Sequence, residues 1–257
     1  MKLWGDYHTH TIYSHRKGTL GHHAKGTLED NVAQAVKIGL KEIAITDHGF
    51  NHKLFCTYRK NLDMLKTECK RLSQKYKINV LLGVEANLIS ERGDIDVLPE
   101  DYEKLDIVLV GYHKLVKGLK AKDQWTFLLP NFLFKSKRRK ERNTQAFVRA
   151  IENNRIDVIT HLKQDICVDS VKIAEAAAKK GTIIELNNKH FHLTDDEFIA
   201  VAKTGVKFII DSDAHKPQNI GGCENVLEKI KRLNIPVEQV VNLDSLPEFL
   251  NYKRKRG

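Results

Sequence analysis

Short apolar runs alternate with helical patterns along the whole chain. Strands buried on both faces of a parallel sheet are apolar along their length, whereas amphipathic helices repeat apolar residues about every 3.6 positions. The strict alternation of the two indicates an α/β fold with a parallel sheet and helices outside it. The apolar runs predict seven strands, at residues 2–10, 41–46, 78–84, 107–111, 156–160, 182–186 and 206–210.

The predicted helices carry their own start and stop signals. Thr27 is followed by Asp30, and Thr194 by Glu197, at the spacing of a capping box at a helix N-terminus. Gly181 is placed to end a helix. The helical patterns begin after Thr27, continue at 62–76, 143–153 and 170–180, run from 195 to about 205, and finish at 226–233 and 246–252.

Side chains that can bind metals stand at or just past the C-terminal end of strand after strand. In a parallel barrel these ends converge on one rim, whereas in an open doubly wound sheet they spread along a line and most could not meet. Convergence therefore favours a closed barrel. The residues are His8, His10, His48, Glu85, His113, His161, Asp213 and His215.

The first strand supplies two of these candidate ligands. Side chains alternate between faces along a strand, so Asp6, His8 and His10 are expected to point the same way. Tyr7 and Thr9 are then expected to face outward against a covering helix. Two imidazoles on one face of a strand can bind a single metal ion.

Together with His15, the candidate ligands are seven histidines, one glutamate and one aspartate. Neutral imidazole and carboxylate suit zinc, and also manganese or iron. One ion takes about four protein ligands or fewer, so the set indicates two or three divalent transition metals, with zinc favoured. Glu85 is the natural bridge between two ions.

Composition adds limits to this interpretation. The chain has 257 residues, 41% of them hydrophobic and 30% charged, which suits one large soluble domain. No apolar run approaches the roughly 18 residues of a membrane span, and no signal-peptide pattern is present. We therefore expect a cytoplasmic protein with no membrane partner, and the net charge of +10 suggests acidic partners. The cysteines, which form no C-x-x-C pair and fit free thiols, are Cys56, Cys69, Cys167 and Cys223.

A set of short motifs runs through the chain, namely Y-H-T-H-T at 7–11, I-T-D-H-G at 45–49, G-V-E-A-N at 83–87, G-Y-H at 111–113, T-H at 160–161, E-L-N-N at 185–188 and D-S-D-A-H at 211–215. Together they resemble the PHP superfamily, named for polymerase and histidinol phosphatase. The resemblance extends from the N-terminus to about Asn242. It is closest to the small stand-alone bacterial members, which are described as zinc-dependent phosphatases.

The resemblance implies a distorted seven-stranded (β/α) TIM-like barrel with a trinuclear metal centre at its C-terminal rim, in a single domain over residues 1–257. A first ion would be bound by His8, His10, Glu85 and Asp213. A second would share Glu85 and add His113 and His161, and a third would use His15, His48 and His215. The catalytic residues would be Glu85, Asp213 and His215.

Other polar residues near the ligands carry further expectations. Asp6 and Asp47 could orient imidazoles from outside the metal shell. Arg16, Lys114 and Lys163 adjoin ligands and could meet the remaining charge of a phosphate. The histidines that match no ligand motif, and that are assigned to the surface or the substrate mouth, are His22, His23, His52, His190 and His192.

The sequence departs from the family pattern at three places. His161 is followed by Leu162-Lys163 instead of Pro-Gly, and His15 stands one residue earlier than expected. An insertion at about 117–142 is longer and more basic over 125–142 than in relatives. An apolar half followed by a basic half is compatible with a lid over the metal rim, a helix on the barrel flank or a subunit contact.

These observations favour a metal-dependent hydrolase, a phosphomonoesterase that hydrolyses a small phosphorylated metabolite through a metal-activated hydroxide. No G-x-S-x-G motif or glycine-rich nucleotide loop points to another mechanism. One alternative is a 3′–5′ exonuclease or other nucleic-acid phosphodiesterase, for which the basic residues 135–142 and the short tail 253–257 could contact a phosphate backbone. A second alternative is a non-catalytic, metal-stabilised module that binds a partner. The oligomeric state stays open.

Overall fold

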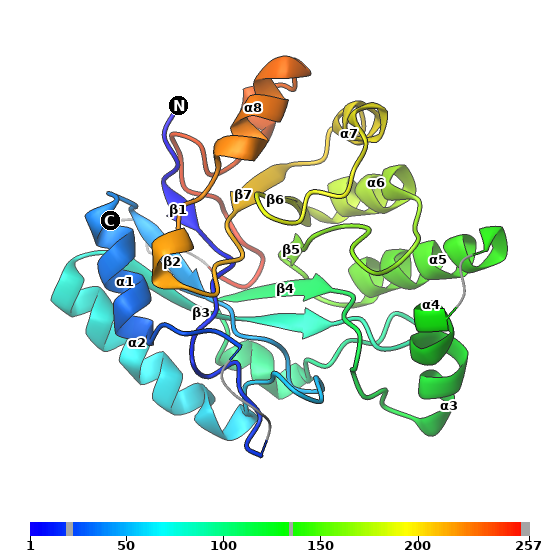
Figure 1. Cartoon of the computed structure of the whole chain (residues 1–257), viewed down its shortest axis with the longest axis horizontal. Coiled ribbons are helices and arrows are strands. Elements are labelled where there is room, and N and C mark those ends of the chain that lie inside the picture. The colour runs from blue at the N-terminus through cyan, green and yellow to red at the C-terminus, as the bar shows by residue number, and fades with distance from the viewer. Residues whose placement is uncertain (19–22, 134–135, 253–257) are drawn as a thin grey trace.

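The computed structural model of the chain describes residues 1–18, 23–133 and 136–252. Its strands form one seven-stranded sheet in sequence order, and every neighbouring pair is parallel (Figure 1). The expected seven-stranded barrel with outer helices is confirmed. The strands are β1 (Gly5–Asp6), β2 (Glu42–Ile45), β3 (Asn79–Asn87), β4 (Ile107–Gly111), β5 (Val158–Ile159), β6 (Ile183–Asn187) and β7 (Phe208–Asp211).

The main helices lie between the strands, on the outside of the barrel (Figure 1). Both predicted capping boxes are present. Asp30 N donates to Thr27 Oγ1 over 3.1 Å and Thr27 N donates back to Asp30 Oδ2 over 2.9 Å; Thr194 and Glu197 form the same pair of bonds. The helices are α1 (Leu28–Lys37), α2 (Leu62–Tyr76), α3 (Ala121–Asp123), α4 (Leu129–Leu133), α5 (Lys137–Asn153), α6 (Ser170–Lys180), α7 (Asp195–Ala202) and α8 (Glu224–Arg232).

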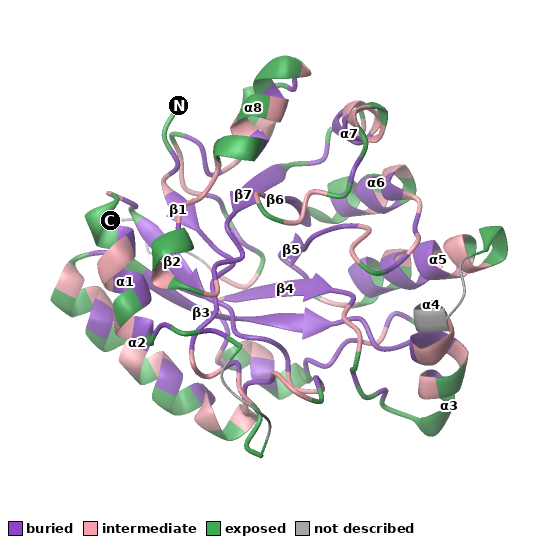
Figure 2. Cartoon of the chain, viewed as in Figure 1, coloured by how far each residue is buried: buried purple, intermediate pink, exposed green. Residues whose placement is uncertain are grey.

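Two apolar layers pack against the strands, and Figure 2 shows the helices buried on the side that faces the sheet. The larger layer joins helices to the outer face of the sheet. The smaller one contains no helix residue among those described, so it fills the barrel interior; its buried members are Tyr7, Ala44, Leu81, Ile107, Leu109, Val158, Ile183, Ile209 and Phe249.

Strand alternation links this interior layer to the polar rim. Leu81, Gly83 and Glu85 lie on one face of β3, because every second residue points the same way. Leu81 belongs to the apolar interior, so Glu85 also points inward, but nearer the C-terminal end of the strand. Gly83 separates the two, and a Cβ there would stand 2.4 Å from Ile107 Cγ2. The barrel is therefore filled with apolar groups at its base and with charged groups at its rim.

The first strand is shorter than predicted, and its expected alternation is wrong. Beyond Asp6 the chain leaves regular strand geometry. The Asp6 carboxylate accepts from Ser212 Oγ over 2.6 Å and from Gly221 N over 2.8 Å, and so does not share a face with the two histidines. Tyr7 lies in the barrel interior, and Thr9 donates to Ala44 O on β2 instead of facing a helix.

The barrel closes through a loop segment instead of a strand pair. Among the described strands, β1 pairs with β2 and β7 with β6, but β1 and β7 form no ladder. Near the base, the buried side chain of Asn242 fills the seam. Its Nδ2 donates to Gly5 O over 3.0 Å and to Ile210 O over 2.7 Å, and its Oδ1 accepts from Ile210 N over 3.0 Å. Near the rim, His10 N donates to Ala214 O over 2.9 Å.

The predicted final helix at 246–252 is wrong, because this segment is irregular in the structure. Phe249 instead packs against Tyr7 under the barrel, with ring centroids 5.0 Å apart. Leu250 N and Asn251 N both donate to the buried Asp157 carboxylate.

The insertion forms part of the barrel wall. Phe127 is fully buried against Tyr112, and Tyr112 Oη donates to Leu128 O over 3.1 Å. Most of the basic run at 135–142 belongs to α5, which packs on α6. This part of the insertion therefore matches the expected alternative of a helix on the barrel flank. Phe134, Lys135 and the tail 253–257 lie outside the described residues. Within the described ranges no helix combines the length and apolar character needed to cross a membrane.

Replacing Asn242 by Ala tests the seam. We expect the free energy of unfolding to fall by about 2–4 kcal/mol, because Ile210 N, Ile210 O and Gly5 O would lose buried partners. Urea denaturation measures the change. The matched control is Gln218→Ala, an exposed amide whose removal should shift stability by less than about 0.5 kcal/mol. Equal stability of the two variants would mean that other contacts hold the seam.

Candidate metal centre

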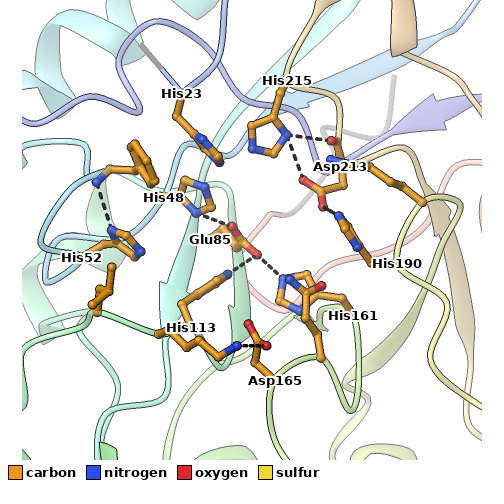
Figure 3. Close-up of a pocket in the computed structure, with 15 residues that line it drawn as sticks. His23, His48, His52, Glu85, His113, His161, Asp165, His190, Asp213 and His215 are labelled. Atoms are coloured by element: carbon orange, nitrogen blue, oxygen red, sulfur yellow. Dashed lines mark hydrogen bonds and ion pairs between the residues drawn. The ribbon is translucent and has the colours of Figure 1, made fainter. Parts of the chain in front are cut away.

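Glu85 is the centre of a ring of histidines at the C-terminal rim (Figure 3). Its Oε1 lies 2.6 Å from His161 Nε2 and 3.0 Å from His113 Nε2. Its Oε2 lies 2.7 Å from His48 Nδ1, and His8 Nε2 stands 3.3 Å from Oε1. Residues from five different segments of the chain therefore meet at one buried carboxylate.

Asp213 is a second carboxylate beside the first. It follows β7 and has a left-handed backbone, with φ of +51°. Its Oδ1 lies 3.2 Å from His10 Nε2, 3.4 Å from His215 Nδ1 and 3.6 Å from His8 Nε2. Glu85 and Asp213 thus share His8 as a neighbour. The residues around Asp213 come from both sides of the barrel seam.

Three groups of side chains could each hold a metal ion, with ligand atoms within 4.8 Å of one another. Glu85 belongs to two groups, as a bridging carboxylate would. The groups are His8–His10–Glu85, His48–Glu85–His113 and His10–His48–His215.

The hydrogen bonding of these rings fits metal ligands. In the portion of the chain that is described, His8 Nε2, His10 Nε2 and His215 Nε2 are buried and make no hydrogen bond. Buried polar atoms are rarely left without a partner, since their desolvation is costly. A cation among them would satisfy all three nitrogens.

The opposite ring nitrogens are held from outside. His8 Nδ1 lies 2.6 Å from Glu185 Oε1, and His113 Nδ1 lies 2.8 Å from Asn87 Oδ1. His215 Nδ1 donates to Asp213 O over 2.9 Å. When Nδ1 carries the proton, a neutral ring presents the Nε2 lone pair to the cavity, which is how outer partners orient metal-binding histidines.

Asp47 and Asp6, both expected to orient metal-binding imidazoles, make different contacts in the structure. Asp47 acts on His10 through Ser14, whose Oγ donates to Asp47 over 2.6 Å and lies 3.3 Å from His10 Nδ1. Asp6 touches only the backbone N of His8, at 3.5 Å, and not its ring. Burial raises the pKa of the Asp47 carboxyl to about 6, although hydrogen bonds from Ser14 and Thr11 oppose this.

Burial and neighbouring charge set the protonation of the rim. Burial lowers the pKa of His10 to about 3, assisted by His215, and lowers that of His23 to about 4. The pKa of Glu85 lies well below its ordinary value, because the charges of His113, His8 and His48 outweigh its burial. Burial opposes protonation of His8, but the charges of Glu85, Glu185 and Asp213 raise its pKa well above the ordinary value. A metal ion bound by His8 would therefore displace a proton from the ring.

The structure places His23 beside the third group. The His23 ring lies 4.3 Å from that of His215 and 5.2 Å from that of His48, and it stacks on Phe55 at 4.0 Å. Neither His15 nor His23 belongs to the three groups formed by described residues. Sequence reasoning assigned His23 to the surface or the substrate mouth; His22 lies outside the described residues.

A cavity of about 450 Å³ opens over these ligands. Of the three cations predicted to bind substrate, Lys114 lines it and forms an ion pair with Asp165. Lys163 pairs instead with Glu197 at 2.7 Å, and neither Lys163 nor Arg16 is among the described lining residues. Lys189, which the sequence reasoning missed, lines the cavity together with His52 and His190.

A match to a known protein family shows which family the chain belongs to. The model of the PHP domain matches residues 6–212. The chain belongs to the PHP family. A probable phosphatase of Thermoanaerobacter sp. (strain X514) is 32% identical over 100% of this chain and 98% of its own length. A probable phosphatase of Shewanella loihica is 31% identical over 100% of this chain and 97% of its own. These full-length PHP relatives confirm the expected phosphatase class of hydrolase.

A solved structure supports the same fold. Histidinol phosphate phosphatase from Lactococcus lactis, complexed with zinc, L-histidinol and phosphate, superposes with a TM-score of 0.63. The alignment covers 98% of each chain at 15% sequence identity. At this identity the likeness establishes the fold of the PHP barrel.

Glu185 is the residue of this PHP site that sequence reasoning left without a role. It stands at an inward position of β6, and a charge inside the run I-I-E-L-N was the signal that could have found it. Its Oε1 holds the His8 ring, and its Oε2 accepts from His161 N over 2.5 Å. His161 has φ of +26°, uncommon without glycine, so Glu185 also fixes the turn that replaces the expected Pro-Gly path.

Replacing Glu185 by Gln tests this double role. Its three partners, on His8, His161 and Asn187, are N–H donors, and an amide offers only one acceptor oxygen. We expect about ten- to a hundredfold weaker zinc binding, measured by competition with a chelator, with the thermal transition largely retained. The exposed Glu175→Gln on α6 is the matched control. Unchanged zinc affinity in Glu185→Gln would contradict the role of Glu185 in orienting His8.

Proposed function

We propose that this chain is a metal-dependent phosphomonoesterase that hydrolyses a small phosphorylated metabolite. The observation that carries the proposal is the pair of buried carboxylates, Glu85 and Asp213, which are surrounded by imidazoles and both line one cavity. The phosphatase relatives support it. The four cysteines are free in the structure, which suits the cytoplasm as the location.

The proposed metal ligands start from the three groups and add Asp213, His161 and His23, which lie beside them. His8, His10, Glu85 and Asp213 would hold a first ion. Glu85 would be shared with a second ion, which His113 and His161 complete. Zinc is favoured, since the zinc-bound phosphatase from Lactococcus lactis has the same fold and the donors are imidazole and carboxylate.

A third ion would be bound by His48 and His215, with His23 in place of His15. The rings of His23 and His215 stand edge to face at 4.3 Å, close enough for both to reach one ion. His23 comes from the loop before α1, so it approaches the cavity from the side opposite the β4 loop that carries His113 (Figure 3).

When bound, closely spaced divalent metals lower the pKa of a coordinated water and neutralise phosphate charge. The chain itself supplies the other groups that meet the substrate. Lys189 faces the cavity and can bind a phosphate oxygen, and Lys114 adds a second cation. Asp165 orients Lys114 through their ion pair.

His52 lines the cavity as a fixed, neutral ring. Its Nδ1 accepts from Leu54 N over 3.2 Å and from Phe55 N over 3.0 Å, so the proton resides on Nε2. Burial lowers the pKa of His52 to about 4, assisted by the nearby His113 and opposed by a hydrogen bond to the backbone of Lys114. His52 would therefore add no positive charge to the cavity, and its ring proton is already engaged by the chain.

The alternative functions fit the geometry less well. A cavity of about 450 Å³ suits a small ester, and most of the basic run that could bind nucleic acid lies on α5 at the barrel flank. A purely structural metal site would be closed by its ligands, whereas this one opens to a cavity.

The proposed function is tested with metal-loaded protein on phosphomonoesters, phosphodiesters and single-stranded DNA, with metal content measured on the same sample. We expect at least two metal equivalents and turnover of monoesters, lost with chelator and restored by zinc or manganese. Glu85→Gln should reduce turnover by about ten- to a hundredfold or more, since it removes the shared charge. Activity with a metal content near zero would overturn the proposal, and cleavage of DNA alone would favour the exonuclease.

The third site is tested by comparing two histidine variants. His23→Ala should lower the metal content by about one equivalent, because it removes a proposed ligand, whereas His15→Ala should leave the content unchanged. Elemental analysis of both variants gives the result directly. A loss of metal only in His15→Ala would restore the assignment made from the sequence.

A further inference from the structure

A second cavity of about 170 Å³ adjoins the metal cavity. The two share His113, Lys114 and Leu115 as lining residues. The remaining wall comes from Lys53, Tyr112, Val116, Gln124, Leu128 and Leu129. The small cavity therefore lies next to a proposed metal ligand, His113, and extends away from it towards the insertion.

The wall of this second cavity is mainly apolar. Val116 and Leu128 are buried, and the Tyr112 hydroxyl is already engaged by Leu128 O over 3.1 Å, so Tyr112 offers only its ring. Leu115 stands at the junction of the two cavities with 53% of its surface exposed. An exposed leucine next to a polar reaction site is a surface that a ligand can cover.

Backbone pairing holds the wall in place. Lys53 N donates to Leu115 O over 2.9 Å, and Lys117 N donates to Asn51 O over 3.0 Å, so the loops after β2 and β4 are joined. Leu115 has φ of +60°, a left-handed conformation that is unfavourable for leucine. Strained residues of this kind persist where the surroundings fix them, often at ligand sites.

We infer that the second cavity binds an uncharged aromatic or apolar group of the alcohol to which the phosphate is esterified. The inference rests on the proposed phosphatase function. The volume of the second cavity, about 170 Å³, is close to that of a 150 Å³ apolar cavity known to hold benzene. The described lining includes two lysines and no carboxylate, which disfavours a cationic amine.

The test compares phenylphosphonate with methylphosphonate, which share the phosphonate and differ in the apolar group. Calorimetry on the zinc-loaded protein measures binding, and turnover is not used because phenol and methanol differ as leaving groups. We expect phenylphosphonate to bind at least about tenfold more tightly, the scale of selectivity in an apolar pocket.

Leu115→Asn is the diagnostic variant, because asparagine tolerates the left-handed backbone while removing the apolar face. We expect it to reduce the preference for phenylphosphonate by about three- to tenfold, with methylphosphonate affinity unchanged. Leu119→Asn is the matched control, since Leu119 is 55% exposed and lines neither cavity.

The outcomes separate the subsite from the function. Equal binding of the two phosphonates, or equal effects of Leu115→Asn and Leu119→Asn, would overturn the subsite and leave the phosphatase proposal standing. Binding of neither phosphonate, with no binding of inorganic phosphate in the same calorimetric experiment, would overturn the phosphatase proposal and the subsite with it.

Discussion

A carboxylate removed from water is stable only if donors or cations replace its hydration, and this protein buries several of them at one end of the barrel. Glu85, Asp213 and Glu185 are compensated by surrounding imidazoles and by the His161 N–H. The rim is organised around this requirement. Some of these imidazoles are in turn held from outside the ring, as His8 is by Glu185 and His113 by Asn87.

The sequence predicted the fold and the main ligands because both follow from local patterns. Alternation in a strand fixes which residues share a face, and the C-terminal ends of parallel strands meet at one rim. Glu85, His113 and His161 were located by this reasoning, and the structure brings them within hydrogen-bonding distance. The capping boxes at Thr27 and Thr194 were predictable for the same reason, since they depend on residues three apart.

The features that sequence reasoning missed depend on contacts between distant segments. His23 meets His215 across the barrel mouth, and Glu185 meets His8 across 177 residues of chain. The length of β1 was overestimated: the strand has two residues, not the nine predicted at 2–10. The conformation of the chain beyond it is set by tertiary contacts, including that of Asp6 with Ser212. The Leu246–Tyr252 segment has a helical pattern but forms no helix. The packing of Phe249 against Tyr7 outweighs the local helical preference.

The seam that Asn242 fills has a consequence for the whole chain. His8 and His10 stand on one side of this seam and Asp213 and His215 on the other. An ion bound across it, as proposed, would act as a removable cross-link between the first and last strands. By mass action, stability would then rise with the logarithm of free metal concentration. The N-terminal and C-terminal regions would separate first when metal is scarce, so metal supply would set how long the folded chain survives proteolysis.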